Sequence, residues 1–134
     1  MSRMIIAYIA TMIIFALIDF IWLGTVAKSF YRNQIGDLLL KDFRMDAAVV
    51  FYVIYIAGIV FFAVRPALEA ESLRTAFLLG AAVGFLCYAT YDLTNLATLK
   101  GFTATVAIVD IAWGTALTAM TAFLAAWFTR FVTA

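Results

Sequence analysis

Three aspartates lie inside stretches of the sequence that are otherwise apolar. They are Asp19, Asp92 and Asp110, whereas the other acidic residues lie in loops or at the ends of apolar stretches. An acidic side chain at the centre of a membrane helix costs about 2.5–3.5 kcal/mol on the insertion scale, and such residues usually serve a site inside the protein. These three residues are therefore the first candidates for chemistry.

The three aspartates are predicted to lie at one depth in the membrane. Asp19 and Asp92 precede Lys28 and Lys100 by similar numbers of residues, and Asp110 follows the second lysine by about as many. With a rise of about 1.5 Å per residue, each lies about 12–14 Å below the same face. No Lys, Arg or His lies within the apolar body of any predicted span. Burial and mutual repulsion disfavour the charged form, so we expect the three to titrate as a coupled set. At least one or two of them should be protonated at neutral pH unless a cation or water fills the site.

Polar and aromatic side chains near the aspartates are expected to share their site. On the third apolar stretch, Tyr88 and Asn95 fall on the helical face of Asp92, with Tyr91 beside them. An indole follows each of the other two aspartates by one helical turn, and its N–H is a potential donor. The predicted ligand-binding pocket comprises Asp19, Trp22, Tyr88, Tyr91, Asp92, Asn95, Asp110 and Trp113.

Three glycines predict where the helices pack. Gly80 and Gly84 form a G-x-x-x-G pair on the face of Asp92, and Gly114 lies on the face of Asp110. Small residues at this spacing allow two membrane helices to approach closely. The pattern therefore predicts that Asp92 faces the protein interior and not lipid.

The composition identifies the elements that must position these residues. The chain has 134 residues, of which 67% are hydrophobic and 13% are charged, against about 45–50% and about 25% in ordinary soluble domains. Mean hydropathy is +1.09. Lipid cannot satisfy exposed backbone groups, so an all-α four-helix membrane bundle is predicted as a single domain over residues 1–134. The predicted spans are about 4–27, 47–64, 73–99 and 103–129.

Two details of this scheme depend on local pattern. The second span is predicted to end at Val64 because Pro66 disfavours helix in the residue before it. Residues 28–46 carry apolar side chains at helical spacing among charges, which predicts a short helix in the membrane interface or an extension of the second span. Tyr31 is expected in the interfacial aromatic belt. Tyr52 and Tyr55 are expected to pack between helices, with a cavity as the alternative.

Several kinds of site are excluded by what the sequence lacks. There is no histidine, so neither a His-ligated haem nor a His-box di-iron site is expected. Cys87 is the only cysteine, and a net charge of +1 argues against a nucleic-acid partner. A divalent cation remains possible, with Asp19, Asp92 and Asp110 as candidate ligands, because hard cations prefer oxygen ligands.

Four spans place both termini on the same side of the membrane. Basic residues are divided four against five between the two sides, so the positive-inside rule does not choose an orientation.

The segments "DFIWLG", "FYVIYIAG", "YDLTNLATL" and "DIAWG" together are similar to a family of small bacterial membrane proteins, the domain-of-unknown-function 2177 family. The resemblance covers nearly the whole chain. It implies a four-helix protein of the bacterial inner membrane, and it implies no particular activity, substrate or cofactor.

Three functions fit these residues. We favour a binding or transport module, whose pocket holds a proton, a cation or a small amphiphile. Its expected partners are the membrane lipid and, because four spans are few for a transporter, a second copy in a homodimer. A lipid-modifying enzyme would use Asp92 or Asp110 as general acid or base, with Asn95 orienting the substrate. A structural or assembly subunit would use the aspartates only to lock helices together.

Overall fold

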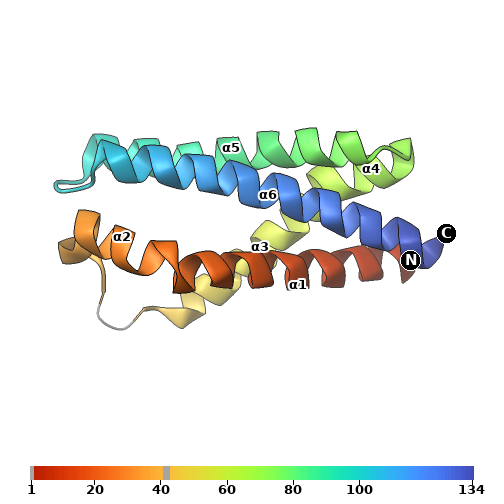
Figure 1. Ribbon diagram of the computed structural model, residues 1–134, viewed down its shortest axis with the longest axis horizontal. Helices are drawn as coiled ribbons and strands as arrows, with labels where there is room; N and C mark the ends of the chain where they lie inside the picture. The colour runs from red at the N-terminus through yellow and green to blue at the C-terminus, as the bar shows by residue number, and fades with distance from the viewer. Residues whose placement is uncertain (1, 41–42) are drawn as a thin grey trace.

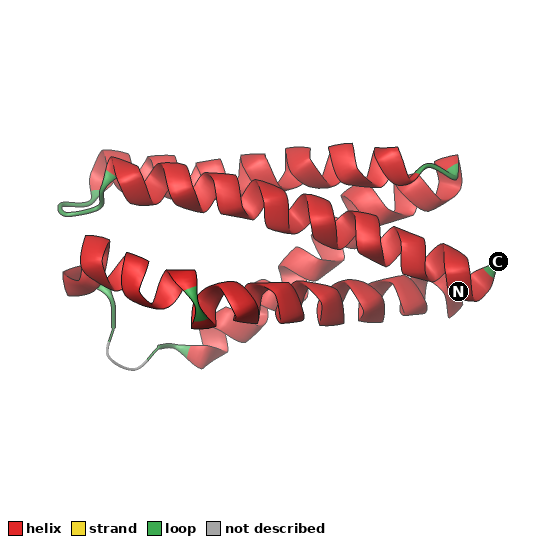
Figure 2. Ribbon diagram, in the orientation of Figure 1, coloured by secondary structure: helices red, strands yellow, loops and turns green. Residues whose placement is uncertain are grey.

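Four long apolar helices make up the protein. The computed structural model describes residues 2–40 and 43–134, and this part of the chain is helical with short loops and no strand (Figure 2). Each long helix has the length and hydropathy to cross a membrane. The predicted all-α four-helix membrane bundle is therefore confirmed. The four spans are α1 (Ser2–Gly24), a composite second span (Met45–Ala70), α5 (Leu73–Thr98) and α6 (Ala104–Thr133).

α1, α5 and α6 run along the long axis of the molecule, and the second span crosses them obliquely (Figure 1). α6 lies between α5 and α1, and both chain ends lie at the same end of the bundle (Figure 1). Apolar side chains cover much of the outer surface, as expected for contact with lipid. Large exposed examples from all four spans are Ile13, Leu17, Ile54, Phe62, Leu78, Leu86 and Ile108.

The second span differs from its predicted limits. It consists of α3 (Met45–Ile59), the π-helical turn η2 (Val60–Val64) and α4 (Arg65–Ala70). The predicted end at Val64 is therefore wrong, because the helix continues through Pro66. In η2 the Arg65 N–H donates to the Val60 carbonyl five residues earlier. This wider turn accommodates a residue that has no N–H and whose ring would crowd an α-helical turn. The other predicted spans end within four residues of the observed helices.

The segment between the first two spans folds separately. α2 (Val26–Ile35) and the 3-10 turn η1 (Gly36–Leu38) follow α1, and α3 begins only at Met45. The segment does contain its own short helix and is not an extension of the second span. α2 begins two residues before the predicted segment 28–46 and ends within it, and Lys41 and Asp42 lie outside the described residues. A small apolar cluster joins Ile35 to Phe102 and Val106 of the α5–α6 end.

α5 and α6 pack together most closely because glycines line their contact. A Cβ added at Gly80 would lie 2.8 Å from the Thr118 carbonyl oxygen, and one at Gly84 would lie 2.8 Å from the Thr118 Cβ. A Cβ at Gly114 would collide with the Tyr88 ring. These three positions therefore bring Tyr88 and its neighbours on α5 directly against α6.

Side-chain caps fix where the last two spans begin. The Thr75 N–H donates to the Ser72 Oγ at 3.1 Å before α5. The Val106 N–H donates to the Thr103 Oγ1 at 3.1 Å before α6. Each cap satisfies a backbone donor that the helix leaves without a partner. The caps hold the register of the two helices that carry Asp92 and Asp110.

α3 leaves part of the bundle open. Apart from η2, which continues it along the chain, α3 packs against α1, and few of its residues approach α5. In its first half, Val50, Phe51 and Val53 are about half exposed or more. The first half of α3 is therefore separated from α5, and this separation shapes the site described next.

Candidate functional site

Asp92 and Asp110 form a pair between α5 and α6. The two carboxyl groups are close enough to interact with each other. Asp92 is 0% exposed, and neither of its carboxylate oxygens has a hydrogen-bond partner among the described residues. Buried polar groups are almost always hydrogen-bonded, so an unpartnered buried carboxyl group calls for a proton or a ligand.

α2 supplies a third member of this cluster. The Tyr31 hydroxyl donates to the Asp110 Oδ1 at 2.5 Å, although α2 lies outside the four spans. Burial and the neighbouring Asp110 carboxylate raise the pKa of the Tyr31 phenol, so it stays protonated and acts as a donor. Tyr31, expected in an aromatic belt, instead covers one side of the aspartate pair.

Asp19 has a different environment. The Tyr52 hydroxyl of α3 donates to its Oδ2 at 2.5 Å, and the Trp113 Nε1 of α6 donates to its Oδ1 at 3.4 Å. Trp22 stacks on Trp113, with ring centroids 4.3 Å apart and planes 8° apart. Both oxygens of Asp19 therefore have donors, and its contacts join three helices.

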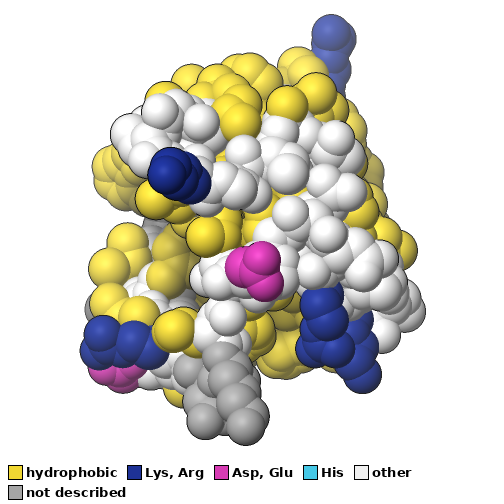
Figure 3. Space-filling view, turned by 90° about the vertical axis from the view of Figure 1, so that its left-hand side faces the viewer, with side chains coloured by type: hydrophobic (Ala, Val, Ile, Leu, Met, Phe, Trp, Pro, Cys, Tyr) yellow, Lys and Arg dark blue, Asp and Glu magenta, His cyan; other side chains and the backbone are white. Residues whose placement is uncertain are grey.

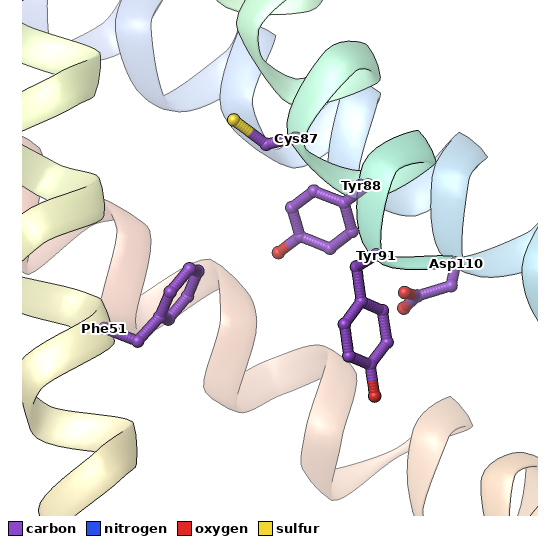
Figure 4. Close-up of a pocket in the computed structure, with 5 residues that line it drawn as sticks. All are labelled: Phe51, Cys87, Tyr88, Tyr91 and Asp110. Atoms are coloured by element: carbon purple, nitrogen blue, oxygen red, sulfur yellow. The ribbon is translucent and has the colours of Figure 1, made fainter. Parts of the chain in front are cut away.

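A cavity opens beside the aspartate pair. It has a volume of about 280 Å³ and is lined by Phe51, Cys87, Tyr88, Tyr91 and Asp110 (Figure 4). Phe51 projects from α3 across the space, and the two tyrosines project from α5. The walls are thus largely aromatic, and Asp110 is the acidic group among them. This combination of aromatic faces and a carboxylate suits an organic cation.

Hydrogen bonds and ring contacts fix two sides of the cavity. The Tyr55 and Thr118 hydroxyls bond to each other at 2.8 Å, and the Tyr55 ring meets the Tyr88 ring edge-on with centroids 6.2 Å apart. Tyr91 meets Phe102 edge-on with centroids 6.3 Å apart. Tyr88 is therefore held from two sides, by Tyr55 and by the α6 glycine contact.

The structure divides the eight residues of the predicted pocket into groups. Tyr88, Tyr91 and Asp110 line the cavity, whereas Asp92 is fully buried next to Asp110 and does not line it. Asp19, Trp22 and Trp113 make a second cluster through the contacts described above. Asn95 is half-buried one turn from Tyr91, nearer the α5–α6 loop, and does not line the cavity.

The three aspartates do not form the metal site that the sequence allowed. Within residues 2–40 and 43–134, no group of three or more His, Cys, Asp or Glu side chains is placed to hold a metal ion. The reason is the direction of Asp19, which is engaged by Tyr52 and Trp113.

Four residues of the site were not assigned to it from the sequence. Phe51 and Cys87 line the cavity, and Tyr31 and Tyr52 donate to aspartates. A tyrosine on an apolar helix is more often a packing residue, so its type alone gave no signal. The one available signal was that each aspartate needs a donor and that the basic side chains of the spans lie only near their ends.

Four helices that are long and apolar enough to cross a membrane, with buried acidic groups between them, indicate a multi-pass membrane protein. A family model described as "Predicted membrane protein (DUF2177)" matches residues 4–127, so the chain belongs to that family. The family resemblance of the sequence segments is thereby confirmed. No curated protein and no solved structure matches the chain.

Proposed function

We propose that this protein binds a small organic cation with apolar groups inside the membrane, and exchanges it for a proton on the Asp92–Asp110 pair. The observation that carries the proposal is Asp92, fully buried and without a hydrogen-bond donor, beside an acid that lines an aromatic cavity. The protein would be a binding or transport module of the bacterial inner membrane, with both termini on the same side.

Charge supports a cationic ligand. Two adjacent carboxyl groups in a poorly polarisable environment share a proton readily, because like charges at close range disfavour double ionisation. The Tyr31 hydroxyl stabilises negative charge on Asp110. The pair with one proton therefore keeps one negative charge, and a bound cation would allow the second carboxyl group to ionise. Cation and proton would then compete for the same two groups.

The cavity walls support an organic cation over a metal ion. Phe51, Tyr88 and Tyr91 present aromatic rings, and ring faces attract ammonium groups by about 0.5–2 kcal/mol each. A volume of about 280 Å³ is close to the lower limit of ordinary small-molecule sites, about 300 Å³. A compact ammonium group with one aromatic or short aliphatic substituent fits this space.

The position of α3 supports access from the bilayer. Phe51 stands on the side of the cavity where α3 and α5 are separated, and its side chain is 47% exposed. An amphiphile dissolved in lipid could reach Asp110 by this route without crossing the bundle. A homodimer would close the same opening from outside, and we propose it as the arrangement in which transport occurs.

Cys87 allows a direct test. It lines the cavity and is the only thiol in the chain, so its alkylation by N-ethylmaleimide reports on this site alone. Phenyltrimethylammonium should slow alkylation of the full-length protein in detergent, and more so as pH rises. Its neutral isostere tert-butylbenzene should not. Asp110→Asn should abolish the protection by the cation.

Two results would count against the proposal. Equal protection by the cation and the isostere would mean that the cavity accepts any apolar molecule. Protection that persists in Asp110→Asn would remove the carboxylate from recognition. Arg74→Gln, at the opposite end of the bundle, is the control for a general effect of charge.

The hydrogen bonds of Asp19 favour a structural role for this aspartate, but not for the other two. Both of its oxygens accept hydrogen bonds, from α3 and α6, and its side chain is only 9% exposed. We propose that Asp19 locks α1 to its neighbours. The hypothesis of a structural role in joining helices thus applies to Asp19, and the hypothesis of ligand binding applies to Asp92 and Asp110.

A further inference from the structure

We infer that a groove at the α2 end of the bundle binds the phosphate group of an anionic phospholipid. This groove is separate from the aspartate cavity, and the inference does not depend on the proposed function. The groove has a volume of about 430 Å³ and lies between α2, η1 and the loop that joins α5 to α6. Side chains that line it include Arg32, Asn33, Gln34, Asp37, Leu38 and Lys100.

The groove carries an excess of positive charge. Arg32 and Lys100 reach it from two different elements, and Asp37 is the acidic residue on its wall. The ion pairs formed within residues 2–40 and 43–134 lie elsewhere, at Arg44–Asp46 and Arg65–Glu69. Two cations with no carboxylate within ion-pair distance in this part of the chain can both turn to an anion.

The walls of the groove are held in place. The Thr103 hydroxyl donates to the Gln34 Oε1 at 3.0 Å and joins α2 to the start of α6. Gly101 has φ of 81°, a backbone conformation that favours glycine, and it turns the chain directly after Lys100. The buried Ile35 and Phe102 belong to one apolar cluster, which holds the end of α2 against the start of α6. Arg32 on α2 and Lys100 in the α5–α6 loop are thus held at one groove without a ligand.

The surroundings favour a lipid over a soluble phosphate ester. α5 ends at Thr98, so the groove lies where a spanning helix leaves the membrane and headgroups begin. Leu38 lines the groove, and Leu39 and Leu40 beside it are 38% and 58% exposed. Figure 3 looks onto this end and shows basic side chains next to apolar surface. A phosphate held by the basic pair would leave acyl chains free to follow these leucines.

Binding of short-chain lipids to the full-length protein tests the inference. Dihexanoyl phosphatidylglycerol is titrated into protein in neutral detergent, and binding is followed by ³¹P NMR line broadening. Dihexanoyl phosphatidylcholine and inorganic phosphate are titrated in parallel. Phosphatidylglycerol should bind more tightly than phosphatidylcholine and more tightly than inorganic phosphate. Arg32→Gln or Lys100→Gln should each weaken binding about fivefold, from the energy of one basic residue near an anionic surface.

Matched variants make the result decisive. Arg74→Gln removes an exposed charge at the other end of the bundle and should leave binding unchanged. Arg32 and Lys100 are exposed, so both variants should fold, which helical circular dichroism checks. Unchanged affinity in the Arg32→Gln/Lys100→Gln double variant would overturn the site. Equal affinity for phosphatidylcholine, or equal affinity for inorganic phosphate, would overturn the assignment to an anionic lipid.

Discussion

Asp92 and Asp19 are both buried acids, and they differ in whether anything donates to them. Asp19 accepts bonds from Tyr52 and Trp113, whereas Asp92 has no donor. Asp19→Asn turns an amide N–H toward a donor and should lower the free energy of unfolding by about 1–2 kcal/mol. Asp92→Asn replaces a carboxyl group that has no donor with a neutral amide, and it should leave that free energy unchanged or raise it. Unfolding of both variants in mixed micelles measures the difference.

The same substitution at two similarly buried positions serves as its own control. If Asp92→Asn costs as much stability as Asp19→Asn, Asp92 has a structural partner and the reason for assigning it to a ligand site is lost. If Asp19→Asn is neutral, its role as a lock fails.

Tyr31 should make stability depend on alkaline pH. Because burial and Asp110 raise the pKa of its phenol above the unfolded value of about 10, its contribution is fully present below pH of about 10. The contribution is lost as pH rises above that value, since only the unfolded chain then releases the proton. Tyr31→Phe should therefore be less stable than wild type at pH 7, by about 1 kcal/mol, and the gap should narrow above pH of about 10.

Thermal unfolding of both proteins across that range tests this prediction. Phe has no proton to lose, so the comparison isolates Tyr31 from the other tyrosines. A gap that stays constant with pH would mean that the hydroxyl makes no bond to Asp110 in the folded protein.

At the level of the helices, close packing of α5 on α6 should be the most sensitive contact. A Cβ at Gly84 would lie 2.8 Å from the Thr118 Cβ and against the Gly114 carbonyl, so the helices must separate. Gly84→Ala should lower the free energy of unfolding by about 1–3 kcal/mol. Gly58→Ala is the control, because nothing lies within 4 Å of its added Cβ. That change should stabilise α3 by about 0.5–1 kcal/mol. Equal effects at the two glycines would show that helix contact is not the cause.

Helices were easier to predict than the contacts between them. Length and hydropathy found the four spans, and the glycine pattern found the face on which α5 meets a neighbour. The end of the second span was predicted wrongly because proline disrupts α-helical turns, whereas the chain forms a wider π turn just before Pro66. The sequence pattern indicates which face of a helix is buried, but it does not identify the helix that covers that face.

For the candidate site too, features within one helix were predictable, whereas contacts between helices were not. Periodicity placed Tyr88, Asp92 and Asp110 toward the interior, and the structure has them there. The donors to Asp19 and Asp110 come from α3 and α2, and their positions depend on how a loop returns the chain to the bundle. No local pattern encodes that path. Equal depth was therefore insufficient to show that three acids share one site.

For the molecule as a whole, the helices differ in how tightly they pack, so we expect them to differ in how readily they unfold locally. α6 is the most buried helix and contacts both α5 and α1, whereas the first half of α3 has few neighbours. Hydrogen exchange of the full-length protein in detergent should be slowest in α6 and the facing half of α5, and fastest in residues 45–54 among the spans. Equal protection of residues 45–54 and α6 would argue against an opening between α3 and α5.

The π turn at Val60–Val64 also has a consequence for deletions in the second span. Its five-residue hydrogen-bond spacing holds one residue more than an α-helical turn, so a single residue can be removed here without rotating α3 relative to α4. Pro66 opposes that deletion, because in a regular α-helix its ring would meet the carbonyl of the residue four positions before it. The extra residue and the proline are therefore coupled. A relative that is one residue shorter at this turn is expected to have lost the proline as well.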